Sequence, residues 1–62
     1  MGLYEKVQDA CADKNMSVLA LEEKMGFVRG TFYKWNTNKP SFERVIAVAK
    51  ELDKPIEYFA ES

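Results

Sequence analysis

Histidine is absent from the 62-residue chain, and cysteine occurs once, at Cys11. A structural zinc site takes its four ligands mainly from these two residue types, and catalysis by Ser–His or Cys–His pairs needs a histidine. The adjacent Glu22 and Glu23 do not form an acid–base pair, because neighbouring helical positions do not face each other. No glycine-rich phosphate loop occurs either. We therefore expect no enzyme, no metal site and no cofactor, with Cys11 as a reduced core residue.

Long apolar runs are also missing, so the sequence predicts no membrane-spanning helix and a cytoplasmic protein. The length suits a single domain, residues 1–62, near the lower limit for a core that is stable by itself. Hydrophobic residues make up 47% of the chain and aromatic residues 13%, which favours a folded domain over a disordered segment.

Helical periodicity and capping residues divide the chain into short helices, and no strand pattern is seen. Ser17 and Ser41 are N-cap residues. Gly26 follows a helix end, where left-handed backbone is common, and Pro55 suits a first helical position. The expected helices cover residues 3–14, 17–25, 28–36, 42–53 and 55–60. Short connections between them predict an all-α, compact five-helix bundle.

The segment from Ser17 to Trp35 holds two of these helices, which are joined by a tight turn at Gly26. Two short helices joined through a glycine-containing turn are typical of the helix-turn-helix motif. The second of them, residues 28–36, would then be the recognition helix that enters the major groove of DNA. An ordinary helical hairpin without a ligand has the same periodicity and is the alternative.

Four parts of the chain together carry a resemblance to a known family. They are Ser17 to Phe27 with its Met25-Gly26-Phe27 end, Trp35, Pro40-Ser41, and the ending from Leu52 to Phe59. In this register the chain resembles the phage repressor and Cro-like helix-turn-helix proteins, also called the XRE family. The resemblance implies a lambda-repressor-like bundle that binds a double-stranded DNA operator as a transcription regulator, usually as a homodimer on a palindromic site.

Two positions depart from the pattern of that family. Its members often carry Gln at the start of the second helix and a small polar residue at the start of the third, where this chain has Val18 and Val28. Both differences remove a polar contact with DNA. They also suit a protein-binding helix-turn-helix module, such as an anti-repressor that engages a repressor protein. A further alternative is that these residues are the N-terminal domain of a longer regulator.

Charge is distributed unevenly along the chain, although the net charge is only −1. From Lys24 to Arg44 there are five cations and one anion, whereas the rest of the chain holds four cations and nine anions. Because affinity for DNA depends largely on neutralising phosphates, a basic segment on an otherwise acidic chain favours DNA binding at that segment. A charged face that is merely solvated is the alternative.

The predicted DNA-facing residues belong to the third helix and the loop after it. They are Val28, Arg29, Gly30, Thr31, Tyr33, Lys34, Asn36, Asn38 and Lys39. Arg29 suits a bidentate contact with guanine O6 and N7 or a phosphate contact, and Gly30 would permit close approach of the backbone. Thr31 suits a thymine methyl or a phosphate. The residues expected to face the core are Phe27, Phe32 and Trp35.

The C-terminal helix supplies a predicted partner surface. Tyr58 and Phe59 are expected to take part in a homodimer interface, which would match the two-fold symmetry of an operator. Phe59 is also expected to cap the core against Leu3 and Val7.

Overall fold

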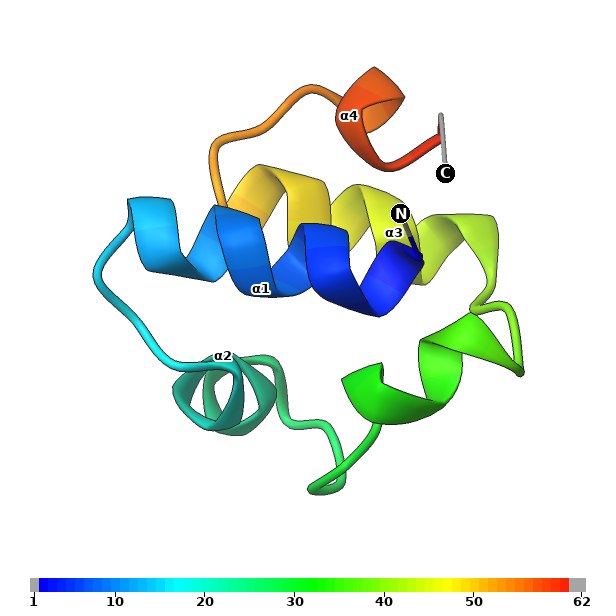
Figure 1. The fold of residues 1–62 in the computed structure, drawn as a ribbon, viewed down its shortest axis with the longest axis horizontal. Coiled ribbons are helices and arrows are strands. Elements are labelled where there is room, and N and C mark those ends of the chain that lie inside the picture. Colours follow the sequence, from blue (N-terminus) through cyan, green and yellow to red (C-terminus); the bar gives the residue numbers. More distant parts are fainter. Residues whose placement is uncertain (1, 61–62) are drawn as a thin grey trace.

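The computed structural model describes residues 2–60, which form α-helices and one 3₁₀ helix, with no strand in that range (Figure 1). The helices are α1 (Leu3–Asp13), α2 (Val18–Met25), the 3₁₀ helix η1 (Phe32–Asn36), α3 (Phe42–Glu51) and α4 (Ile56–Ala60). The expected all-α class is therefore confirmed. Within residues 2–60, none of these helices combines the length and the apolar character that crossing a bilayer requires.

The helices pack around α1, which contacts α2, η1 and α4, while α3 contacts α4. In Figure 1, α4 lies on one side of α1 and α3, and α2 and η1 lie on the other side. The described chain measures 24 × 22 × 20 Å along its principal axes, so no helix extends away from the body. The segment between α2 and α3 thus forms one end of the molecule.

Local capping explains where the helices begin and end. The Ser17 hydroxyl accepts a hydrogen bond from the Ala20 N–H at 3.0 Å at the start of α2. Gly26 ends α2 in left-handed backbone with φ +73°, where a side chain would be strained. Ser41 caps α3 in the same way as Ser17 caps α2, with the Arg44 N–H as donor. These sequence-based capping predictions are confirmed.

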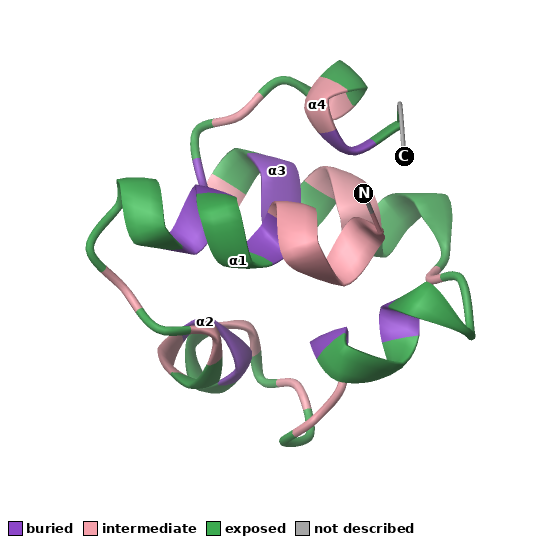
Figure 2. Cartoon of the chain, viewed as in Figure 1, coloured by how far each residue is buried: buried purple, intermediate pink, exposed green. Residues whose placement is uncertain are grey.

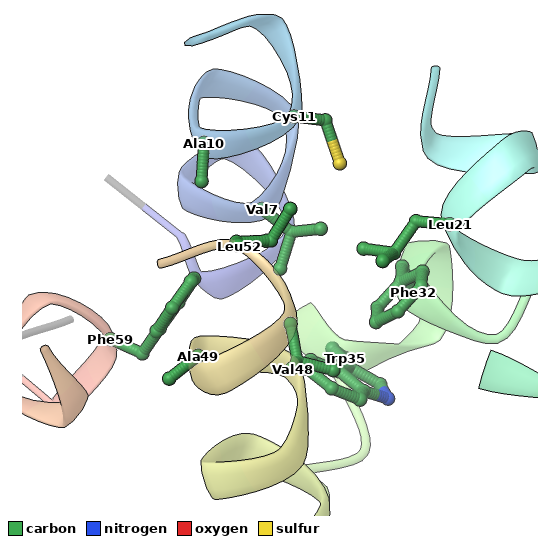
Figure 3. Close-up of a cluster of buried hydrophobic side chains, with 10 residues drawn as sticks. All are labelled: Val7, Ala10, Cys11, Leu21, Phe32, Trp35, Val48, Ala49, Leu52 and Phe59. Atoms are coloured by element: carbon green, nitrogen blue, oxygen red, sulfur yellow. The ribbon is translucent and has the colours of Figure 1, made fainter. Parts of the chain in front are cut away.

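The core draws on every helix (Figure 3). Phe59 enters it from α4, and Leu21 and Phe32 enter from the opposite side. The buried hydrophobic residues are Val7, Ala10, Cys11, Leu21, Phe32, Trp35, Val48, Ala49, Leu52 and Phe59. Burial raises the pKa of the Cys11 thiol above its ordinary value, which suits the expected reduced core residue. The predicted core positions of Phe32, Trp35 and Phe59 are confirmed, and Phe27 packs half-buried against the core.

Residues 28–31 do not continue a helix, which corrects the prediction of one recognition helix over residues 28–36. They form a turn in which the Val28 C=O accepts from the Thr31 N–H at 3.1 Å. Gly30 has φ +88°, far from the value of about −63° that an α-helix needs. Residues 2–60 therefore form four α-helices where five were expected, with the five-residue η1 in place of the third.

A joint between the ends of α1 and α3 is held by two crossed ion pairs. Lys14 pairs with Asp53, and the Lys54 Nζ lies 2.8 Å from a carboxylate oxygen of Asp13. Asn15 and Asp53 both have φ +56°, so each helix is followed by a left-handed residue. The hydrogen bond and charge of Lys14 lower the pKa of Asp53, and the hydrogen bond to Asp13 raises the pKa of Lys54. We call these four charged residues the crossed joint.

Candidate nucleic-acid interface

A groove of about 460 Å³ lies between the turn at residues 28–31 and the start of α3. Its walls come from the turn, η1, the loop after it and the first turn of α3. The lining residues are Val28, Arg29, Thr31, Lys34, Trp35, Asn38, Lys39, Pro40, Ser41 and Arg44. Six of the nine predicted DNA-facing residues are among them. We call this feature the basic groove.

Four cations and no carboxylate line the basic groove. The cations are Arg29, Lys34, Lys39 and Arg44. Within residues 2–60, none of the four forms an ion pair, although Lys14, Lys24 and Lys54 do. The N-terminus of α3 also opens here, because its cap residue Ser41 lines the groove. Helix N-termini carry partial positive charge, which adds to the field of the four cations, and the acidic Glu43 in the first turn of α3 offsets part of it.

The turn at residues 28–31 is anchored to α2 by a buried carboxylate. Glu22 is only 3% exposed. Its two oxygens accept from the Gly30 N–H at 3.1 and 3.2 Å, and one of them accepts from the Phe32 N–H at 3.2 Å. Both donors would otherwise lack a partner in this turn, so the carboxylate fixes the geometry of the segment that carries Val28 and Arg29.

Sequence reasoning missed the role of Glu22. Its signal was present, because Glu22 lies one turn after Val18 and next to Leu21 on the apolar side of α2. A carboxylate on a buried helix face needs hydrogen-bond donors. The donors are backbone groups eight and ten residues further along the chain, which no local pattern identifies.

Aromatic rings support the inner wall of the basic groove. The Arg44 guanidinium carbon lies 5.5 Å from the centroid of the Phe27 ring, a distance that permits a cation–π contact. Phe27 in turn packs on Phe32 with 5.5 Å between ring centroids, and Phe32 packs edge-on against Trp35 at 4.6 Å. Arg44 is thus connected to the core through a row of rings, and this packing restricts where its guanidinium group can lie.

Three predicted DNA-facing residues do not line the groove. Gly30 serves the turn through its positive φ, and a Cβ built on it would meet nothing within 4 Å. Tyr33 is 71% exposed and packs edge-on against Tyr4, with 5.6 Å between ring centroids. The Asn36 Oδ1 accepts from the Tyr4 N–H at 3.0 Å, and its Nδ2 donates to Glu5 at 3.1 Å. Asn36 therefore joins η1 to the first turn of α1.

The two predicted partner-surface residues differ in burial. Phe59 is 2% exposed, so its side chain belongs to the core and offers almost no surface to a partner. Tyr58 is half-buried, with its ring packed edge-on against Phe59 at 5.0 Å and the Lys54 Nζ 5.1 Å from its centroid. Of this pair, only Tyr58 keeps accessible surface.

The arrangement is suited to holding an anion with several phosphate groups. Guanidinium and ammonium groups of the basic groove supply charge, and the Thr31 and Ser41 hydroxyls and the Asn38 amide supply further hydrogen-bonding groups. Figure 2 shows that most of the segment from η1 to the first turn of α3 is exposed, so these groups are open to a large ligand.

Comparison of the chain with protein-family models, with curated protein sequences and with solved structures gave no match.

Proposed function

We propose that this protein binds double-stranded DNA at an operator, through the basic groove, as a sequence-specific transcription regulator. One observation carries the proposal. Four cations that form no ion pair among the described residues line a single groove of a chain whose net charge is −1. A groove that only needed solvation would not require this segregation of charge, and the phosphates of DNA present a series of anions that such cations neutralise.

In this proposal α2, the turn and η1 take the places of a helix-turn-helix motif, with the turn and η1 facing the major groove. Lys34, Lys39 and Arg44 position the protein on phosphates, and Arg29 at the tip of the turn reads a base. The resemblance to phage repressor and Cro-like proteins supports this assignment. A homodimer that uses the exposed part of Tyr58 would match a palindromic operator in the cytoplasm.

A second candidate function is binding to a repressor protein, as an anti-repressor would. Phe42 is 67% exposed at the rim of another groove, of about 520 Å³. That groove has a mainly apolar lining, which includes Leu3, Val45 and Ile56. Exposed apolar surface of this kind favours a protein partner over DNA.

Selection of bound duplexes from a random DNA pool tests the first proposal. We expect a palindromic motif, and we expect Arg29→Ala to lose sequence information at one position and about 1–3 kcal/mol of binding free energy. Removing Lys34 or Lys39 should instead weaken all duplexes alike and reduce the slope of log affinity against log salt by about one. Lys50→Ala is the matched control, since Lys50 is exposed on α3 outside the basic groove.

A different outcome would overturn the proposal that the protein binds DNA. If no duplex is enriched, and if wild type, Arg29→Ala and Lys50→Ala bind DNA equally weakly at low salt, the protein-binding function replaces the first proposal. Sedimentation with and without the selected duplex tests the homodimer separately. A monomer in both samples, with one protein per duplex, would overturn that part.

A further inference from the structure

Val28 is an isolated apolar side chain at the tip of the turn. It is 80% exposed, more than Leu19, Tyr33 or Phe42, which are the other exposed large hydrophobic residues of the described chain. None of those three lines the basic groove. Exposure of a branched apolar side chain to water is unfavourable, and packing within the fold does not require Val28 at this position.

The surroundings of Val28 are polar and positively charged. Arg29, Thr31 and Lys34 line the groove beside it. A protein partner that covered Val28 would bury one apolar side chain among several cations, whereas protein-binding surfaces present contiguous apolar patches. The matching ligand therefore has negative charge around a small apolar group.

The major groove of DNA combines these two properties. Its edges carry hydrogen-bonding groups and one apolar group, the C5 methyl of thymine, and phosphates flank it on both sides. We propose that Val28 contacts a thymine methyl and so helps to set the sequence that the protein binds. This inference rests on the proposed function, since it concerns DNA bound in the same groove.

The turn holds Val28 in a fixed place for such a contact. Its carbonyl oxygen accepts from the Thr31 N–H, and Glu22 holds the Gly30 N–H from the side of α2. Valine is also stiff about χ1, so little side-chain entropy is lost on binding. Because Arg29 is the next residue, the thymine should lie near the base that Arg29 reads.

Deoxyuridine substitution gives a direct test, because it removes only the methyl group of thymine. Each thymine of the selected duplex is replaced in turn, and affinity is measured for wild type and for Val28→Ala. We expect one replacement in each half-site to weaken wild type about fourfold, the factor for one buried methyl group. Val28→Ala should bind the thymine and deoxyuridine duplexes equally. Leu19→Ala, the control variant outside the basic groove, should discriminate like wild type.

The possible results distinguish failure of the thymine contact of Val28 from failure of DNA binding itself. If Val28→Ala keeps the wild-type preference for thymine, the inference is wrong, and the loss of affinity in Arg29→Ala still supports DNA binding. If the selected motif has no thymine that matters to wild type, the inference is wrong as well. If no duplex is selected, both the thymine contact and the proposed DNA binding are wrong. An unchanged thermal midpoint of Val28→Ala, expected from its exposure, shows that any change arises at the interface.

Discussion

The crossed joint and the basic groove use cations in opposite ways. At the joint, Lys14 and Lys54 each pair with a carboxylate from the other side of the contact. In the groove, the lining holds Arg29, Lys34 and two further cations but no carboxylate, and none of the four forms an ion pair within residues 2–60. Charges that neutralise each other connect parts of the fold, whereas charges left without partners remain available to a ligand. The two regions therefore separate the structural cations from those that we assign to DNA binding.

The buried carboxylate of Glu22 is likewise used within the fold and forms no ion pair among the described residues. Glu22 lies beside the turn that carries Arg29, yet its oxygens accept hydrogen bonds from the backbone of Gly30 and Phe32. Its negative charge is therefore held on the inner side of the turn by N–H dipoles. This arrangement stabilises the basic groove with an anion that forms no ion pair with its cations.

Replacement of Glu22 should have the largest effect on stability. Glu22→Ala removes the acceptor of the Gly30 and Phe32 N–H groups, so we expect a loss of about 3 kcal/mol in the free energy of unfolding. Glu22→Gln keeps one oxygen acceptor and should lose less. Urea denaturation measures both, with the exposed neighbour Glu23→Ala as control, expected within about 0.5 kcal/mol of wild type. Equal stability of the two alanine variants would show that the carboxylate does not hold the turn.

Replacement of Gly30 should have an intermediate effect and distinguishes a turn from a helix. Because φ is +88° and the space beside the α-carbon is open, Gly30→Ala should destabilise through backbone strain alone, by about 1–2 kcal/mol. Gly30→Asn should lose less, since Asn tolerates left-handed backbone. Circular dichroism during denaturation measures both. If Gly30→Ala were more stable and more helical than wild type, residues 28–36 would form the continuous helix expected from the sequence.

The crossed joint should show the smallest effect, seen best through its pH dependence. The pKa of Asp53 is lowered in the fold, so its contribution is present above the unfolded value of about 3.9 and is lost as pH falls through the folded pKa. Lys14→Gln should return the pKa of Asp53 toward its ordinary value, measured by NMR titration of the carboxyl carbon. High salt should weaken the same interaction in wild type.

The ion pair between Lys54 and Asp13 should contribute stability with the opposite dependence on pH. The pKa of Lys54 is raised, so its contribution is present below the unfolded value of about 10.4 and is lost as pH rises through the folded pKa. If the pKa of Asp53 did not change in Lys14→Gln, Lys14 and Asp53 would not be paired in solution, and the contrast with the basic groove would be lost for that pair.

The sequence predicted those features whose cause lies within one turn of the chain. The Ser17 and Ser41 caps and the left-handed Gly26 each depend on a neighbouring backbone group or on one φ angle. The core positions of Cys11 and Phe59 followed from apolar spacing on their own helices. The fold class and most of the basic groove could therefore be predicted.

The features that could not be predicted depend on contacts between distant residues. Apolar spacing of Phe32 and Trp35 fits a 3₁₀ helix as well as an α-helix, and the carboxylate of Glu22 favours the turn before it. Asn36 was assigned to DNA because it belongs to the predicted third helix and was expected to face outward, but its partner Tyr4 is 32 residues away. Neither partner is visible in a local window of sequence.

The contact of Asn36 with Tyr4 gives the molecule an internal reporter. Its Oδ1 accepts from the Tyr4 amide at the start of α1, a position where helices have N–H groups without intrahelical partners. A change of η1 from a 3₁₀ helix to an α-helix would rotate Asn36 and break its hydrogen bond with the Tyr4 amide. Hydrogen exchange at the Tyr4 amide would then report on the conformation of residues 28–36.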